Sequence, residues 1–271
     1  MTKRDYRLVC SDIDGTILNS QGILTERTRK AILALKQQGI PVVLVSARPP
    51  QGISCFYEAL WEENPPVCAY SGGYIVLDGQ VVFNRTIPLE LTKQICDITR
   101  RHPVHTSLYQ AEHWYVEAMD KEASWEAEAI GFDPEIAEQD KLFEKWTRSH
   151  TEPNKLLCIG QAEEISGLQK VLLRQFGTKL NISLSKATYL EIMPLGVTKA
   201  EAVKVLCSRM GIVPEQMIAF GDHFNDLAML REAGLGIAMG NSPAEIQSAA
   251  DMVAKTNDED GVAEILERLF L

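Results

Sequence analysis

Segments with the pattern of buried strands alternate with segments of helical period at both ends of this chain. Arg7 to Ser11 is a short apolar run that ends in a polar loop, and Glu26 to Gln38 follows with apolar residues at helical spacing. Strand patterns recur at Pro41 to Ser46 and at Val67 to Tyr70. This alternation predicts a parallel sheet with right-handed crossovers, whose ligands bind beyond the carboxyl ends of the strands.

The alternation is interrupted in the middle of the chain. From about Arg85 the strand patterns become alternating ones, and an acidic helical section extends from about Trp125 to Trp146. The first pattern resumes with a helix at Thr198 to Met210 and a strand at Met217 to Phe220. We therefore expect a Rossmann-like α/β core made of residues 1–84 and 196–271, with an α+β cap domain inserted at residues 85–195.

Composition and charge exclude several classes of protein. The chain is 45% hydrophobic and 24% charged, which is typical of a soluble globular protein rather than a disordered or coiled-coil one. Its net charge is −10, and no basic cluster interrupts it, which argues against binding to nucleic acid or to an anionic membrane. The first apolar run is cut by Asp12 and Asp14, so we expect no signal peptide, and no span approaches a membrane helix. Six scattered cysteines are expected to be reduced thiols of a cytoplasmic protein.

The most informative motif is Asp12-Ile13-Asp14-Gly15-Thr16, which directly follows the first predicted strand. Both carboxylates then fall at the carboxyl end of a strand, two residues apart, where they can face one pocket. The alternative is an Asp-rich turn whose side chains cap the backbone. Capping does not explain a carboxylate pair directly after a buried strand.

A second acidic cluster, Gly221-Asp222-His223-Phe224-Asn225-Asp226, follows the strand at Met217 to Phe220 and precedes a helix at Asn225 to Glu232. Parallel strands bring both clusters to the same edge of the sheet. Two carboxylates with a carbonyl and waters suit octahedral Mg²⁺, and no clustering of cysteine or histidine suits zinc. The alternative is that Asn225 and Asp226 cap the helix, and both readings can hold together.

Two further positions could contact an anion. Ser46-Ala47-Arg48 ends the second strand, where a hydroxyl and backbone amides could hold a phosphate oxygen, although serine at a strand end is more often a cap. Lys199 opens a helix, which is the unfavourable end of the helix dipole for a cation unless an anion is near. The alternative for Lys199 is a solvated surface lysine.

These four pieces, in this order, resemble the haloacid dehalogenase superfamily of phosphotransferases. Asp12 to Thr16 resembles the first motif, Ser46 the second, Lys199 the third, and Gly221 to Asp226 the fourth. The insertion resembles the type IIB cap of the Cof-like sugar-phosphatase branch, so the resemblance spans essentially the whole chain. Two departures are Ser46-Ala47-Arg48, where the branch often has Thr-Gly-Arg, and Ser71-Gly72-Gly73, where it often has Asn-Gly-Ala.

The resemblance implies a role for each residue. Asp12 would attack phosphorus to give an aspartyl-phosphate, and Asp14 would act as general acid and then general base. Mg²⁺ would be held by the carboxylates of Asp12 and Asp222 and the carbonyl of Asp14, with Asp226 supporting these ligands. Mg²⁺ and Lys199 would neutralise the phosphoryl oxygens. Four further groups would orient those oxygens: Ser46, Asn225, and the amides of Ile13 and Ala47.

The sequence thus predicts a Mg²⁺-dependent phosphatase that acts on small phosphorylated metabolites such as sugar phosphates, with no protein partner implied. Two alternatives remain at this point: a phosphomutase of the same fold, and a non-enzymatic sensor that binds a phosphorylated metabolite. Asp14 argues against the sensor, because binding alone needs no acid beside a metal-bound carboxylate. The long insertion argues against a phosphoacceptor receiver module.

Overall fold

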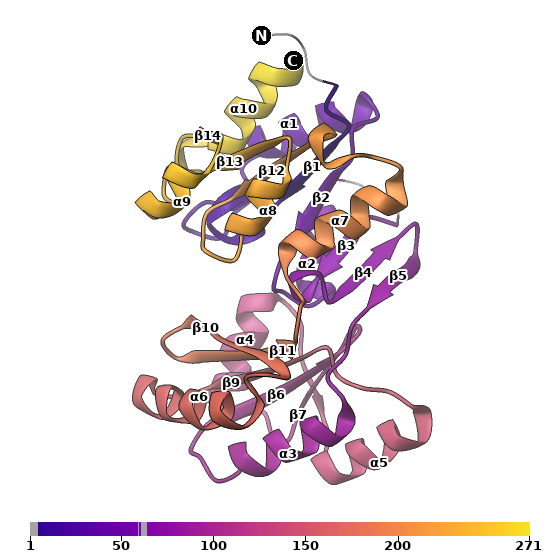
Figure 1. The fold of residues 1–271 in the computed structure, drawn as a ribbon, viewed down its shortest axis with the longest axis vertical. Coiled ribbons are helices and arrows are strands. Elements are labelled where there is room, and N and C mark those ends of the chain that lie inside the picture. Colours follow the sequence, from indigo (N-terminus) through magenta and orange to yellow (C-terminus); the bar gives the residue numbers. More distant parts are fainter. Residues whose placement is uncertain (1–4, 59, 61–63) are drawn as a thin grey trace. The chain divides into compact units, whose positions relative to one another are not determined.

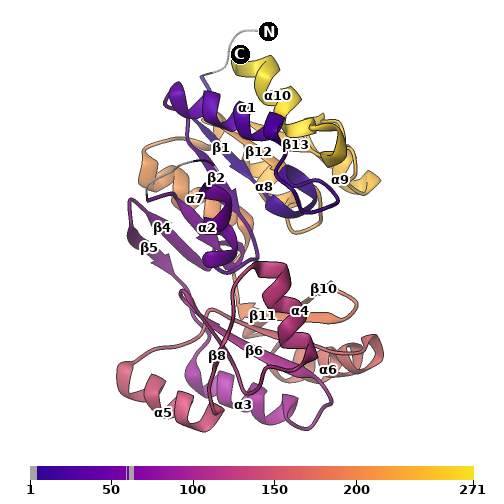
Figure 2. The ribbon, with the colours of Figure 1, turned by 180° about the vertical axis from the view of Figure 1, so that it is seen from behind.

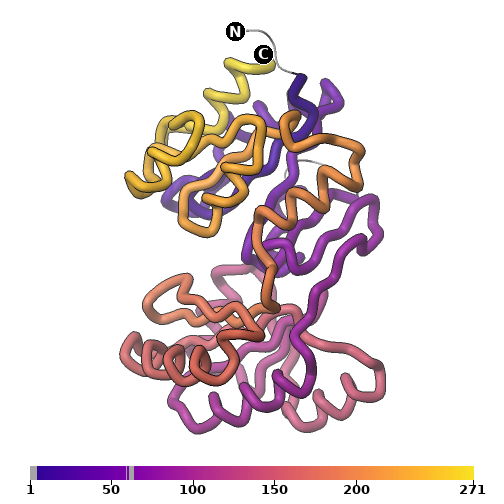
Figure 3. Tube along the Cα trace, viewed as in Figure 1, coloured from indigo at the N-terminus to yellow at the C-terminus, as the bar shows by residue number. Residues whose placement is uncertain are grey.

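The computed structural model describes residues 5–58, 60 and 64–271. The chain folds into two compact units. It leaves the first unit after residue 83 and returns to it at residue 198, and its path can be traced by colour in Figure 3. The first unit contains residues 1–47, 53–83 and 198–271, and the second contains residues 48–52 and 84–197. The short segment 48–52 belongs to the second unit. The predicted boundaries, which assign residues 1–84 to the core, did not include this exchange.

Within the described residues, the sheet of the first unit has eight strands in the order β14-β13-β12-β1-β2-β3-β4-β5. Neighbouring strands from β14 to β3 are parallel, and β4 pairs antiparallel with β3. The bounds are β1 (Leu8–Ser11), β2 (Val42–Val45), β3 (Val67–Ala69), β4 (Tyr74–Leu77), β5 (Gln80–Asn84), β12 (Met217–Gly221), β13 (Leu235–Ala238) and β14 (Met252–Val253).

Helices cover both faces of this sheet, as Figures 1 and 2 show from opposite sides. One face carries α1 (Glu26–Gln37), α2 (Gln51–Glu58) and α10 (Gly261–Phe270), and the other carries α7 (Lys199–Met210), α8 (Leu227–Glu232) and α9 (Ala244–Ala249). Because both faces are covered, every residue of β1, β2 and β12 is buried. Their continuous apolar runs are the sequence signature of such strands, and the predicted α/β fold is confirmed.

Strands β1 and β12 are neighbours, with Ser11 opposite Phe220. From β1 the chain proceeds to β2 on one side, and from β12 it proceeds to β13 on the other. The loops that leave the carboxyl ends of these two strands therefore diverge, which is the point of an open α/β sheet where ligands bind. Asp12 follows β1 and Asp222 follows β12.

The second unit is an α+β domain. Within the described residues its sheet has six strands in the order β10-β11-β9-β6-β7-β8. Their bounds are β6 (His105–Gln110), β7 (His113–Val116), β8 (Glu135–Ile136), β9 (Lys155–Ile159), β10 (Leu180–Lys186) and β11 (Tyr189–Pro194). The core packs α3 (Leu89–Thr99), α5 (Gln139–Ser149) and α6 (Ala162–Phe176) on one face of the sheet, through buried side chains such as Ile95, Trp146 and Leu168.

The prediction of one acidic helical section from Trp125 to Trp146 is wrong in detail. This segment contains the end of α4 (Lys121–Ile130), strand β8 and most of α5. Gly131 ends α4 with a φ of 81°, a conformation that glycine adopts without the steric cost of a Cβ. Among the described residues, no helix is both long enough and apolar enough to cross a membrane.

Candidate active site

The first acidic motif forms a tight turn, Ile13–Ile17, at the end of β1. The Asp12 amide donates to the Phe220 carbonyl at 3.0 Å, which ties the start of the turn to β12. The Leu18 amide donates to the Ile13 carbonyl at 3.1 Å and closes the turn. Because Ile13 is fully buried, it anchors the turn in the core. Asp12 is buried, whereas Asp14 is exposed.

Gly15 allows the turn to approach the second acidic cluster. Its φ is 75°, and a Cβ at this position would collide with the Asp222 carboxylate. The hydroxyl of buried Thr16 lies 3.4 Å from Asp222 Oδ1. Thr16 is not among the predicted site residues, and its place in the Asp-x-Asp-Gly-Thr motif is the feature that marks it in the sequence.

We expect Gly15→Ala to disrupt the contact between the two acidic segments. The positive φ and the collision with Asp222 together should lower the free energy of unfolding by about 1–3 kcal/mol, and phosphatase activity should fall with it. Gly22→Ala is the matched control, because Gly22 has a φ of 72° and a Cβ there would meet nothing within 4 Å. Denaturant unfolding of both variants checks the prediction, and equal losses would mean that the Asp222 contact contributes nothing.

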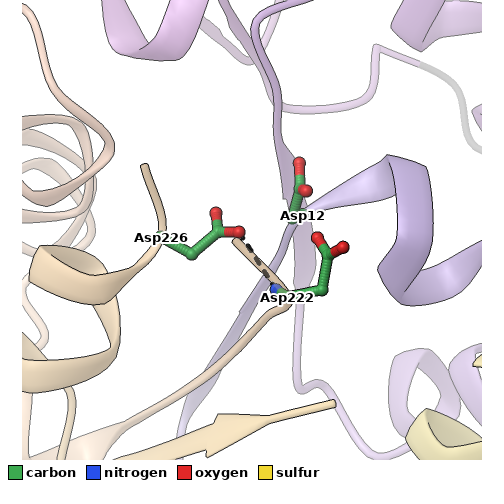
Figure 4. Close-up of side chains that lie close together, drawn as sticks. All are labelled: Asp12, Asp222 and Asp226. Carbon is green, nitrogen blue, oxygen red and sulfur yellow. Dashed lines mark hydrogen bonds between the residues drawn. The ribbon is translucent and has the colours of Figure 1, made fainter. Parts of the chain in front are cut away.

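Asp226 organises the second acidic segment from within. Its Oδ2 accepts hydrogen bonds from the amides of Asp222 and His223, both at 3.0 Å, and Figure 4 shows the first of these. Gly221 permits this fold, because a Cβ there would collide with the Asp226 side chain. Helix α8 begins at Leu227 rather than Asn225.

Asp226 occupies the N-cap position of α8 but makes no side-chain hydrogen bond to an amide of that helix. The expectation that the Asp226 side chain caps this helix is therefore wrong. Asn225 is exposed in the loop that precedes the helix.

Lys199 is the first residue of α7, and its side chain is only 1% exposed. Its Nζ lies 2.6 Å from Asp12 Oδ1 and 2.6 Å from Asp226 Oδ1. Burial lowers the pKa of Lys199, but the two carboxylates outweigh burial and the net pKa lies above its usual value. The surface-lysine alternative is wrong, because paired carboxylates offset both the burial and the helix dipole.

The carboxylates of Asp12, Asp222 and Asp226 offer oxygen atoms within 4.8 Å of one another (Figure 4). Burial raises the pKa of Asp12 to about 8, although Lys199 opposes the shift. Burial and the Asp226 carboxylate also raise the pKa of Asp222. The three carboxylates thus carry more negative charge than the single ammonium of Lys199 can neutralise. A divalent cation would relieve this excess, and a set of oxygen donors fits Mg²⁺.

Ser46 directly follows β2, the strand next to β1, and is 2% exposed. Its amide donates to the Cys68 carbonyl at 3.0 Å, and its carbonyl accepts from the Ser71 amide at 2.7 Å. Ala47 follows and is half-buried. The described residues thus bring Asp12, Lys199 and the two carboxylates of the second segment into direct contact, with Ser46 and Ala47 at the neighbouring strand end.

Comparison with known proteins identifies the family of the chain. The family model of haloacid dehalogenase-like hydrolases matches residues 9–266. A Haemophilus influenzae protein named "Putative phosphatase" is 38% identical, over 98% of each chain. The Bacillus subtilis 5-amino-6-(5-phospho-D-ribitylamino)uracil phosphatase YitU is 28% identical over 97% of each chain.

Solved structures show the same fold. A haloacid dehalogenase-like hydrolase from Bacteroides thetaiotaomicron superimposes with a TM-score of 0.90 and 31% identity, covering 98% of this chain and 100% of its own. TM0651 from Thermotoga maritima gives a TM-score of 0.88 and 32% identity, over 97% of each chain. The chain therefore belongs to the haloacid dehalogenase-like hydrolases. Within that family it is a phosphatase.

Proposed function

We propose that the protein is a Mg²⁺-dependent phosphatase of small phosphomonoesters, among them sugar phosphates, and that it acts through an aspartyl-phosphate on Asp12. One observation carries the proposal: a buried aspartate at the switch point of the sheet is held by a buried lysine, beside two further carboxylates. This arrangement would add little to the stability of the fold, because burying negative charge that is not fully paired costs free energy.

The cation would be held by the carboxylates of Asp12 and Asp222 and by the backbone carbonyl of Asp14. Asp226 supports these ligands, since it fixes the amides of Asp222 and His223 and pairs with Lys199. Mg²⁺ would supply positive charge that lets an anionic phosphoryl group approach two carboxylates. The ammonium of Lys199 adds a second positive charge on the protein's side.

In the first step, an Asp12 carboxylate oxygen attacks phosphorus in line with the leaving group. A bond forms between that oxygen and phosphorus, and the bond from phosphorus to the substrate oxygen breaks. Asp14, protonated at this stage, donates its proton to the departing oxygen. Ser46, Asn225 and the amides of Ile13 and Ala47 orient the phosphoryl oxygens.

In the second step, the Asp14 carboxylate takes a proton from a water molecule. The water oxygen attacks phosphorus, the bond to Asp12 breaks, and inorganic phosphate leaves. Asp12 is restored as a carboxylate and Asp14 as an acid, so the cycle closes without any further reactant. Dividing hydrolysis in this way replaces one difficult displacement by two easier ones.

Phosphate release from a panel of phosphorylated metabolites, with Mg²⁺ or with excess EDTA, tests the proposal. Sugar phosphates should release phosphate with Mg²⁺ present, and chelation should abolish turnover until Mg²⁺ is restored. Ca²⁺ should not replace Mg²⁺, because its looser and higher coordination would let Asp12 bind through both oxygens and weaken its attack. Full turnover in chelator would overturn the metal assignment. Turnover that requires a bisphosphate activator would identify a phosphomutase instead.

Asp14→Asn should separate the two chemical roles of the motif. An alkyl phosphate needs a proton as its alkoxide departs, so its turnover should fall by about 10²–10⁴-fold. An aryl phosphate such as para-nitrophenyl phosphate leaves as a stable anion, so its first step should survive better. Stopped-flow absorbance should then show a burst of nitrophenol followed by slow turnover. Equal slowing of aryl and alkyl substrates, without a burst, would remove Asp14 from the acid-base role.

A further inference from the structure

We propose that Asn241 is a positioning residue that holds the Ile13–Ile17 turn, and with it Asp14, in the geometry needed for proton transfer. The inference rests on the proposed function of Asp14. Asn241 lies in the loop after β13, far from the acidic motifs in sequence, and no sequence motif selected it. It does not act on the substrate itself.

The side chain of Asn241 reaches directly to the residue after Asp14. Its Nδ2 donates to the Gly15 carbonyl at 2.9 Å. Gly15 is also the residue whose missing Cβ lets the turn approach Asp222. A single peptide unit is therefore fixed from two directions, by the asparagine on one side and by the close approach to Asp222 on the other.

Asn257 fixes the orientation of the Asn241 amide. The Asn257 backbone amide donates to Asn241 Oδ1 at 3.1 Å, so the opposite end of the Asn241 side chain must present its NH₂ group. Asn257 Nδ2 also donates to the Leu18 carbonyl at 2.8 Å. The two asparagines thus hold the turn at Gly15, in its middle, and at Leu18, just after its end.

The loops that carry these asparagines are packed closely against each other. The Gly240 amide donates to the Lys255 carbonyl at 3.1 Å, and a Cβ at Gly240 would lie 2.8 Å from the Thr256 amide nitrogen. Glu259 Oε2 accepts hydrogen bonds from the Thr256 hydroxyl at 2.7 Å and from the Thr256 amide at 3.3 Å, at the start of the short turn Asn257–Glu259. Asn241 is therefore presented by backbone whose own position is well determined.

The position of Asp14 needs such support because its side chain is exposed rather than packed in the core. Proton transfer depends on distance and direction at the level of a fraction of an ångström. Asp12, in contrast, is buried. Loosening the turn should therefore impair the acid-base step more than the nucleophile.

Two variants of Asn241 test the inference. Asn241→Asp keeps the shape and the acceptor for Asn257 but turns an oxygen toward the Gly15 carbonyl, and Asn241→Leu removes both hydrogen bonds without adding charge. Both should lower kcat for an alkyl phosphate by about 10²-fold, with KM little changed. The loss for para-nitrophenyl phosphate should be clearly smaller, so the ratio of alkyl to aryl kcat should fall.

Asn19→Ala is the control for loss of loop hydrogen bonds. The Asn19 Oδ1 accepts from the amides of Gln21 and Ile23 in the adjoining loop, and among the described residues the Asn19 side chain makes no hydrogen bond to the Ile13–Ile17 turn. It should lower the melting temperature without changing the alkyl to aryl ratio. Should an Asn241 variant fold poorly, Asn257→Asp, which keeps its backbone amide but turns an oxygen toward the Leu18 carbonyl, should shift the ratio in the same direction.

An unchanged ratio in all the Asn241 and Asn257 variants would overturn the inference, even if their melting temperatures fell. Equal losses for alkyl and aryl substrates would also overturn it, since they would indicate a structural role shared with Asp12. Wild-type protein that released no phosphate from either substrate would instead overturn the proposed function. The ratio is measured against active wild-type enzyme, so the two failures are distinguishable.

Discussion

Asp12→Asn is expected to abolish phosphate release, with a loss in kcat of at least about 10⁴-fold for alkyl and aryl substrates alike. Asparagine has the size and shape of aspartate but cannot accept a phosphoryl group as a stable intermediate. The fold should persist. Burial raises the pKa of Asp12 to about 8, which means that the folded protein disfavours the charged form of this side chain, and neutral asparagine avoids that cost. Steady-state assays and thermal unfolding of the same preparation check both halves of this prediction.

Asp14→Asn is the matched comparison, since it makes the same chemical change two residues away. That variant should retain burst chemistry with the aryl substrate, whereas Asp12→Asn should show no burst. Turnover by Asp12→Asn within about tenfold of wild type would mean that another group, or water itself, attacks phosphorus. A melted Asp12→Asn variant would indicate that the carboxylate is needed for folding, contrary to our account of its burial.

Lys199→Met should produce the largest loss of stability. Lys199 Nζ pairs with Asp12 and Asp226 at 2.6 Å while almost fully buried, so its removal leaves two buried carboxylates without their cation. Breaking a buried ion pair in this way costs about 3–5 kcal/mol in the free energy of unfolding. Activity should fall by about 10²–10³-fold, because a positive charge aimed at the phosphoryl group is lost. Denaturant unfolding in EDTA measures the first effect.

Two further variants separate charge pairing from other causes. Lys204→Met changes a lysine of the same helix that is 44% exposed and pairs with Glu201 and Glu232 at the surface, and it should change stability by less than about 1 kcal/mol. The double variant Lys199→Met with Asp226→Asn removes one of the stranded carboxylates and should recover much of the lost stability, but none of the activity. A Lys199→Met variant as stable as Lys204→Met would contradict the pairing.

The strands that position the site could be predicted because their sequence pattern has one physical cause. Strands β1 and β12 are covered on both faces, so every residue in them is apolar or small and every one is buried. The acidic motifs directly follow these strands, and parallel strands bring their carboxyl ends to one edge. The contact between the two motifs thus follows from the topology, and the structure places Asp12 beside Asp222.

Local pattern could not predict contacts that depend on the loops. Asp226 stands at a helix start, where capping is the usual role, yet its side chain turns back to the amides of Asp222 and His223. Asn241 lies more than two hundred residues from Gly15 in sequence, and only the folded sheet brings them together. The single helical section predicted across Gly131 was wrong although Gly131 and Pro134 are helix-ending residues, because acidic residues continue on both sides of the break.

Transfer of the phosphoryl group to Asp12 can be tested by locating that group on the enzyme. Asp14→Asn should accumulate labelled enzyme from a phosphate-labelled aryl substrate, because hydrolysis of the intermediate lacks its base. Hydroxylamine should release the label, and borohydride reduction followed by peptide mass spectrometry should show homoserine at position 12. Reduction at another position, or a nitrophenol burst from enzyme that carries no label, would show that Asp12 is not the nucleophile.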